Sequence, residues 1–311
     1  MSNAAKADVL LVLVTILAAI SWIFSKEAVL LMPPFLFISL RFLLAGILLF
    51  VVGFKQFHNL TWNQYRQSII VGCVFAIGMC FWIMGLYSGV SLGVASFITS
   101  SAVIFSPIIA RIFYGETVPV STWYAMPFAL LGLGYLSLSG DLTVQLGQLL
   151  FIFSALFVAL FFVLNSRAAN HRELVGLDEK SRVSEKVPAL PLTAIALMTV
   201  GILSGSLSFI VESWSEVAEN FSASLISWVL ASAFIGTALR FFMQTHAQSL
   251  SSNSHGVVIM IVEPIWTALL AAVWFSEKLV GDDLIGCALV FLSVIIIRWT
   301  LFKKLFKKRI T

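Results

Sequence analysis

Charged residues are scarce in this chain, because only 11% of its 311 residues are Asp, Glu, Lys or Arg. An ordinary soluble domain has roughly 25%. Hydrophobic residues make up 60%, and the mean hydropathy is +1.01. So few charged side chains cannot cover a soluble protein of this length. The composition therefore predicts a polytopic membrane protein.

Sequence signatures of catalysis and cofactor binding are also missing. The cysteines Cys73, Cys80 and Cys287 lie in apolar runs, where a free thiol behaves as a small hydrophobic group, and no metal-ligand spacing occurs. There is no GxxxxGK[ST] phosphate loop, and neither an HExxH nor a GxSxG motif lies inside the predicted helices. We therefore expect no metal, no other cofactor and no ATP hydrolysis.

What the chain does have is a series of long apolar runs separated by short polar connections. A membrane-spanning helix needs about 20 mostly apolar residues, and irregular backbone cannot face lipid. The first run has no small-residue cleavage site, so we interpret it as a retained helix. The sequence predicts an all-α membrane protein with ten transmembrane helices, at roughly 8–25, 34–54, 66–87, 93–113, 121–139, 145–166, 190–211, 223–247, 255–275 and 282–302.

The basic residues predict the orientation of these helices. With the N-terminus inside, only Lys26 and Lys278 fall outside, and Arg41 and Arg240 fall within helices. The other basic residues then lie inside, which favours a multi-pass inner (plasma) membrane protein with both termini cytoplasmic. We interpret the C-terminal "KKLFKKR" as an anchor to anionic lipid rather than a nucleic-acid-binding segment.

The two halves of the chain repeat one another. A shift of 161 residues places Phe105 on Trp266 and Glu116 on Glu277. Each half has five predicted helices, an odd number, so the second copy must be inserted upside down. We predict two inverted five-helix repeats, a transporter architecture with its site near the midplane. The predicted repeats are 1–144 and 145–311, the second including a cytoplasmic loop at 167–189 and the basic C-terminal tail.

Two segments related by this shift resemble a known family. "SFITSSAVIFSPIIARIFYGE" and "IVEPIWTALLAAVWFSEKL" are similar to the paired signature of the EamA family, the ten-helix branch of the drug/metabolite transporter superfamily. "ISLRFLLAGILL", which contains Arg41, resembles that family's second helix. The resemblance covers nearly the whole chain and implies this fold and general transport activity. The two halves differ from each other in one spacing, because Pro107 precedes Glu116 by 9 residues, whereas Pro264 precedes Glu277 by 13.

Glu263 stands near the start of an apolar run, where a carboxylate needs a partner. Arg240 precedes the same short cytoplasmic turn by a similar length of helix, so the two charges are expected at matching depth. We predict an Arg240–Glu263 ion pair. It is either a static clamp, or a site where Arg240 takes anionic substrate groups and Glu263 carries a proton. Pro107 and Pro264 are predicted kink or gating positions.

Aromatic and hydroxyl side chains add further candidates for a substrate cavity. Trp82, Phe105 and Trp266 lie in the central parts of predicted helices, and Thr99 shares one helix face with Ser106. Packing is one interpretation of each. The other is a cavity wall, which would suit amphipathic metabolites such as amino acids, amines or aromatic drugs.

Other polar or small residues in the runs are expected to be structural. Arg41 is predicted to snorkel to the outer face or to bind backbone carbonyls. Glu116 and Glu277 are expected to make capping or interfacial hydrogen bonds. Gly201 and Gly205 form a GxxxG pattern, which predicts a close helix contact.

The function that these patterns favour is secondary transport, with export of small organic metabolites by alternating access. A small-molecule substrate and the lipid bilayer are the expected partners, and nucleic acid is not. An intramembrane enzyme would need a nucleophile and base or metal ligands at membrane depth, and a channel would need a ring of charges or carbonyls. We keep both as alternatives.

Overall fold

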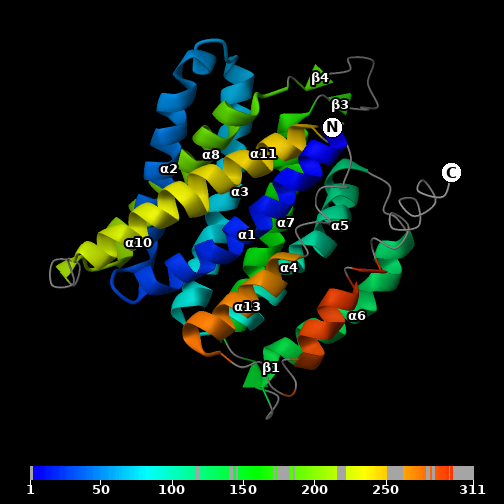
Figure 1. The fold of residues 1–311 in the computed structure, drawn as a ribbon. Coiled ribbons are helices and arrows are strands. Elements are labelled where there is room, and N and C mark those ends of the chain that lie inside the picture. Colours follow the sequence, from blue (N-terminus) through cyan, green and yellow to red (C-terminus); the bar gives the residue numbers. More distant parts are fainter. Residues whose placement is uncertain are drawn as a thin grey trace.

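The computed structural model describes residues 3–115, 120–139, 143–144, 146–170, 172–173, 183–184, 186–215, 222–250, 262–277, 281, 284–293 and 295–296. Within them the fold is almost entirely helical (Figure 1). The strands are four two-residue segments that form two short antiparallel hairpins, β1–β2 and β3–β4. The predicted all-α fold class is confirmed.

The helices follow the predicted runs closely. The first half contains α1 (Asn3–Val29), α2 (Pro34–Phe57), α3 (Trp62–Tyr87), α4 (Leu92–Ser100), α5 (Ala102–Tyr114), α6 (Val120–Ser137), β1 (Leu138–Ser139) and β2 (Thr143–Val144). The second half contains α7 (Leu146–Ala169), β3 (Arg172–Glu173), β4 (Val183–Ser184), α8 (Ala189–Val211), α10 (Ala223–Ala233), η1 (Phe234–Leu239), α11 (Arg240–Leu250), α13 (Glu263–Phe275) and a last helix at Leu284–Ser293.

Seven of the described helical segments are long and apolar enough to cross a membrane. Two more, α13 and Leu284–Ser293, are apolar but shorter. The predicted run 255–275 is described only from residue 262, and about half of the loop 167–189 and the whole basic tail lie outside the described residues. The count of ten transmembrane helices therefore stays a prediction.

Local sequence explains where these helices begin and end. Thr61 precedes α3, its hydroxyl accepts the Gln64 N–H, and the Gln64 side chain accepts the Thr61 N–H in return. The Ser91 hydroxyl caps α4 by accepting the Val94 N–H. Gly115 follows α5 with φ of 65°, a left-handed conformation that glycine adopts without strain.

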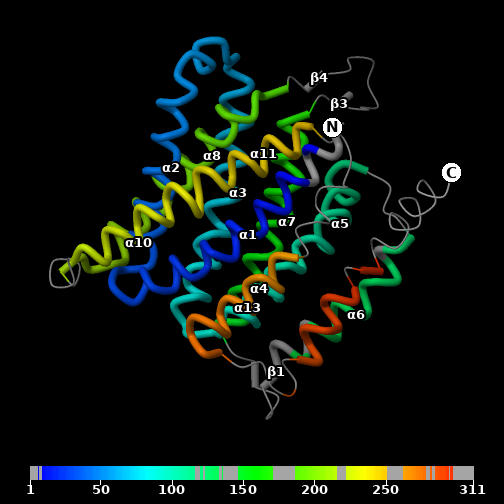
Figure 2. The backbone as a smooth tube through the Cα atoms, in the orientation of Figure 1, coloured from blue at the N-terminus to red at the C-terminus, as the bar shows by residue number. Residues whose placement is uncertain are grey.

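The repeat is visible in the helix boundaries and in the packing. Adding 161 to the bounds of α5 gives those of α13, and adding it to α3 gives 223–248, which matches α10 through α11. The first-half helix α3 packs along α7 of the second half, and α10–α11 of the second half packs along α1 of the first (Figure 2). The central contact joins α2 to α8, which correspond to each other. Exchanging the two halves thus reproduces the packing pattern.

The α2–α8 contact depends on small residues. A Cβ at Gly201 would lie 2.7 Å from the backbone nitrogen of Leu43, and one at Gly205 would lie 2.5 Å from the Ser39 hydroxyl oxygen. Ser39 donates its hydroxyl to the Gly201 carbonyl at 2.9 Å, which ties the two helices directly. The close contact predicted from the GxxxG pattern is confirmed, and it lies within the bundle.

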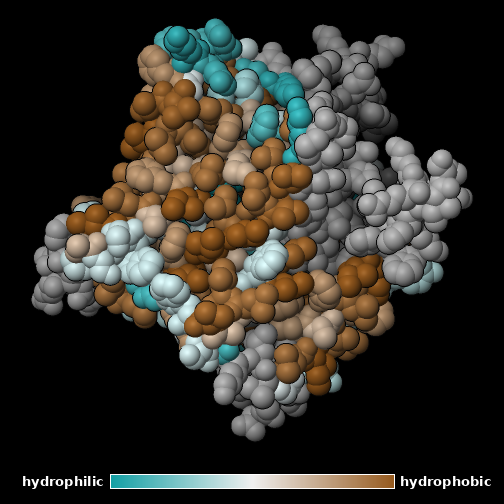
Figure 3. All heavy atoms as spheres, in the orientation of Figure 1, coloured by the Kyte–Doolittle hydropathy of each residue, from teal (hydrophilic) through white to brown (hydrophobic). Residues whose placement is uncertain are grey.

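Apolar side chains also cover the outside of the molecule. In Figure 3 the face across α1 and α10–α11 is mostly hydrophobic, and hydrophilic residues gather at the tip where α2 joins α3. Exposed residues such as Val51, Val52, Ile202 and Phe209 point away from the core. Surface of this kind is stable against lipid tails and unstable against water.

Candidate functional site

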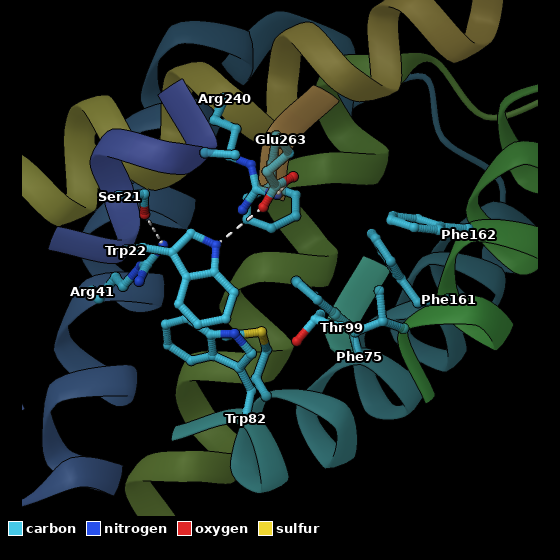
Figure 4. Close-up of a pocket in the computed structure, with 14 residues that line it drawn as sticks. Ser21, Trp22, Arg41, Phe75, Trp82, Thr99, Phe161, Phe162, Arg240 and Glu263 are labelled. Carbon is cyan, nitrogen blue, oxygen red and sulfur yellow. Dashed lines mark hydrogen bonds and ion pairs between the residues drawn. The ribbon is translucent and has the colours of Figure 1, made fainter. Parts of the chain in front are cut away.

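A small cavity of about 50 Å³ lies inside the bundle (Figure 4). Its walls come from both halves of the chain, since α1, α2, α3 and α4 contribute from the first and α7, α11 and α13 from the second. The lining residues are Ala18, Ser21, Trp22, Arg41, Phe75, Met79, Trp82, Thr99, Val158, Phe161, Phe162, Arg240, Phe241 and Glu263.

Arg240 and Glu263 meet at this cavity, as the sequence predicts. The Arg240 Nη2 atom lies 3.4 Å from Oε2 of Glu263, and the Trp22 indole N–H donates to Oε1 at 3.1 Å. Charge-assisted hydrogen bonds in proteins are typically about 2.7–2.9 Å long, so the pair is loose. The Arg240 Nε atom is buried and has no hydrogen-bond partner among the described residues. This guanidinium therefore has capacity for another acceptor.

Arg41 is placed differently from either expectation. Its side chain is 2% exposed, so it does not snorkel to the surface. Nε donates to the Thr237 hydroxyl at 2.5 Å, and Nη1 and Nη2 donate to the hydroxyls of Ser25 and Ser21, each at 2.6 Å. One longer bond, at 3.4 Å, reaches the Gly236 carbonyl. The snorkelling alternative was wrong and the backbone-carbonyl alternative accounts for one long bond only, because the hydroxyls that supply the other partners lie on other helices, out of reach of pattern analysis.

The Thr237 and Gly236 contacts depend on a π-helical segment. The segment η1 interrupts the long helix between α10 and α11, and the Thr237 hydroxyl donates to the Ser232 carbonyl at 2.8 Å. A π turn widens the helix, and such turns often occur at functional sites. Here it directs one hydroxyl and one carbonyl toward Arg41. The sequence showed no signal for this turn.

The charges around the cavity do not balance. Arg41 and Arg240 are basic, and Glu263 is acidic and already bound by Arg240 and Trp22. Among the described residues the hydrogen-bond partners of Arg41 are all neutral. A charged side chain at the centre of a spanning helix costs roughly 2.5–3.5 kcal/mol on insertion scales. Hydroxyl partners and aromatic faces offset part of that cost, but they do not neutralise the charge.

Aromatic rings form much of the remaining wall. The rings of Trp22 and Trp82 lie 4.7 Å apart between centroids, and Phe75 stacks on Phe161 at 4.1 Å. The Arg41 guanidinium lies 5.9 Å from the Trp82 ring, within cation–π range. The site thus combines flat apolar surfaces with two guanidinium groups.

The predicted aromatic and hydroxyl candidates divide into two groups. Trp82 and Thr99 line the cavity. Phe105 packs against the apolar core outside the lining, and Trp266 is 36% exposed on the outer surface of α13. Neither contributes to this cavity. Phe105 and Trp266 correspond under the repeat, but a shared position in the repeat does not fix which way a side chain faces.

The two residues predicted to kink their helices, Pro107 and Pro264, occupy different positions in those helices. Pro107 lies inside α5, and the spanning run that contains it is broken at Ser101, between α4 and α5. Pro264 lies in the first turn of α13, where a missing N–H interrupts no helical bond. The described part of this run therefore has no proline kink at Pro264, and the preceding residues 251–261 lie outside the description.

Beyond the cavity, toward the C-terminal end of α1, three helices are joined by Glu277. Its carboxylate pairs with Lys26 of α1 and accepts the Leu92 N–H of α4 at 2.9 Å. One turn back on α13, the Trp274 indole donates to Glu27 at 2.9 Å. We call Lys26, Glu27, Trp274 and Glu277 the end cluster. The capping role predicted for Glu277 is confirmed, whereas Glu116 lies outside the described residues.

Sequence reasoning missed the residues that hold Arg41. Ser21, Ser25 and Thr237 are single hydroxyls in apolar runs, which are common at helix contacts. A weak signal was available, since Ser21 and Ser25 are four residues apart and so share one face of α1. Among the described residues no group of His, Cys, Asp and Glu is arranged to hold a metal ion.

The chain is similar to known transporters in sequence and to a solved structure in fold. The chain matches the model of the EamA-like transporter family at residues 5–138 and again at 145–299. An uncharacterized transporter of Archaeoglobus fulgidus is 25% identical over 291 residues, which cover 94% of this chain and 85% of that protein. An uncharacterized transporter of Bacillus subtilis is 25% identical over 193 residues, 60% of this chain and 56% of that protein. One crystal structure matches with a TM-score of 0.64 at 17% identity, covering 94% of this chain and 96% of that chain, and so shares the fold.

Proposed function

Because the chain belongs to the EamA-like transporter family, we propose that it exports small organic metabolites across the inner membrane by alternating access, with the cavity as the transport site. The observation that carries this proposal is the cavity itself. It lies between the two repeated halves, where inverted-repeat transporters bind substrate. It holds the buried ionisable groups that mark substrate or ion pathways in membranes.

The end cluster supports the alternating-access part of the proposal. It joins α1, α4 and α13 about one turn beyond Trp22, which lines the cavity. Its bonds are few and lie between side chains at helix ends, so a modest rearrangement breaks them. We propose that the end cluster closes this end of the cavity in one state and separates in the other. With both termini cytoplasmic, this end faces outward.

We propose that Glu263 couples substrate transport to the binding and release of a proton. It is the acidic side chain at the cavity wall, and its bond to Arg240 is long enough to exchange for another partner. When Glu263 binds a proton, the attraction that holds Arg240 is lost and the guanidinium becomes free for substrate. Release of the proton restores the pair. The competing interpretation is a static clamp between α11 and α13.

Proteoliposomes separate these interpretations. We expect saturable uptake of a wild-type substrate to depend on a pH gradient, and Glu263→Gln to transport without that dependence. Glu263→Asp, which keeps the charge, is the matched control and should retain it. A Glu263→Gln protein with wild-type pH dependence and a lower unfolding temperature would make the pair a clamp and remove the coupling role.

A further inference from the structure

We propose that the cavity selects organic monoanions, in particular monocarboxylates with an aromatic or other apolar body, and that Arg41 recognises the carboxylate. The inference rests on the proposed function in one respect, since it takes the cavity to be the transport site. It adds the charge of the substrate and a residue that recognises it, neither of which follows from family membership.

The charges inside the apolar runs, which form the membrane interior of the protein, do not balance. The chain has 15 acidic residues, and only Glu263 lies well inside an apolar run. The others are at the ends of runs or in the polar connections. Arg41 and Arg240 are the basic residues inside runs. This count uses the full sequence, including the segment 251–261, which contains no Asp or Glu. The interior therefore has an excess of one positive charge.

The second step assigns that excess to Arg41. Glu263 is held by Arg240 and by the Trp22 indole, so its charge is matched locally. Among the described residues Arg41 is held only by hydroxyl oxygens and one carbonyl oxygen, with the Phe42 ring 5.4 Å from its guanidinium carbon. These partners fix the orientation of the guanidinium and leave its charge in place. A substrate anion supplies the counter-charge that the protein lacks.

The third step is the shape and chemistry of the wall. Nine of the fourteen lining residues are apolar or aromatic, including Trp22, Trp82 and Phe161. Rings in this arrangement suit the body of an amphipathic molecule. Figure 4 shows Trp22 and Trp82 between the Arg41 side and the Phe161 side of the cavity. A molecule with one anionic end and one apolar end therefore matches both parts of the wall.

These features also disfavour other substrate classes. An organic cation would meet two guanidinium groups and only one carboxylate, which is already bound. A polyol would bury hydroxyl groups against aromatic rings without enough polar partners. A dianion would reverse the imbalance to one excess negative charge. While Glu263 is ionised, a monoanion is the class that brings the interior to neutrality.

The test compares molecules that differ only in charge. Purified protein in detergent is titrated with phenylacetate, indole-3-acetate and octanoate, each beside its primary amide and the amine of the same carbon skeleton, and the unfolding temperature is followed. For at least one skeleton we expect the carboxylate to bind at least tenfold more tightly than its amide and its amine. Equal or tighter binding of the amides or amines, or no carboxylate binding below 10 mM, would overturn the proposal.

Substitutions at Arg41 locate the recognition. Arg41→Gln should abolish the preference for carboxylate over amide, and Arg41→Lys should keep part of it because the charge remains. If Arg41→Gln does not fold, the wild-type comparison above still decides the anion preference, and Arg41→Lys and Ser25→Ala carry the assignment to Arg41. Ser25→Ala leaves the charge and removes one hydroxyl that orients it, so we expect a weaker preference of the same sign. An unchanged preference in every folded Arg41 variant would place the anion elsewhere.

Flux measurements keep this inference separate from the proposed function. Carboxylates that bind selectively but show no saturable flux in proteoliposomes would support the anion site and contradict transport of these molecules through it. Saturable flux of neutral compounds or amines, without carboxylate preference, would support the transport function and contradict the anion site.

Discussion

At the scale of single residues, the account depends on how three ionisable side chains are held. The Arg240–Glu263 pair followed from sequence because both residues flank one short turn at similar spacing. The environment of Arg41 did not, because Ser21, Ser25 and Thr237 come from two other helices. Helix periodicity predicts which residues share a face, but it does not predict which neighbouring helix that face meets.

The hydroxyl of Thr237 provides a direct residue-scale test. Thr237→Val keeps the side-chain shape and leaves the Arg41 Nε–H without its 2.5 Å acceptor. A buried charged group that loses a partner costs roughly 1–3 kcal/mol, so the unfolding temperature in detergent should fall clearly. Thr267→Val is the matched control, since Thr267 is equally buried and donates only to the Glu263 carbonyl of its own helix. Equal losses in the two variants would contradict the role given to Thr237.

At the scale of helices, sequence predicted the positions of the runs and missed their interruptions. The break at Ser101 and the π turn at 234–239 both lie in runs of unbroken apolar character. A hydropathy pattern contains no signal for either, because both depend on contacts with neighbouring helices. Gly236, for example, lies against α1, where a Cβ would meet the Ser21 hydroxyl oxygen at 2.5 Å. The GxxxG contact was predictable, since small residues at that spacing indicate close packing.

The α2–α8 contact gives the helix-scale prediction. Gly201→Val would place its side chain against the Leu43 backbone, which cannot move without displacing α2. Overpacking of this kind typically costs about 1–3 kcal/mol, so we expect lower thermal stability and reduced folded yield. Ile202→Val on the same helix is the control, because Ile202 is 55% exposed and points away from the contact. A stable, active Gly201→Val protein would show that the two helices are not closely packed at this point.

At the scale of the whole molecule, the repeat and the charge distribution were readable from sequence. The 161-residue shift predicts the boundaries of α13 from α5, and of α10–α11 from α3, to within two residues, whereas α8 begins six residues before the shifted start of α2. The cavity was not predictable at the same level. Phe105 and Trp266 satisfied the pattern but do not line it, whereas Trp82 and Thr99 do. A cavity depends on the relative rotation of several helices, and small rotations exchange lining residues for packing residues.

The predicted orientation is tested by labelling. In a variant without Cys73, Cys80 and Cys287, a single cysteine at Asn59, between α2 and α3, should react with a membrane-impermeant maleimide only after the inner face is exposed. A cysteine at Leu30, between α1 and α2, should react from outside in intact cells. The reverse pattern would place the N-terminus outside and contradict the positive-inside assignment.

The most direct test of alternating access is to hold the end cluster closed. In the same cysteine-free background, Lys26→Cys and Glu277→Cys are joined by a reducible bis-thiol reagent, and uptake of a substrate identified by the binding series is measured in proteoliposomes. We predict that cross-linking stops uptake, that reductant restores it, and that each single variant treated with the same reagent is unaffected. Unchanged uptake by the cross-linked protein would show that this end does not open during transport, and it would contradict the central claim.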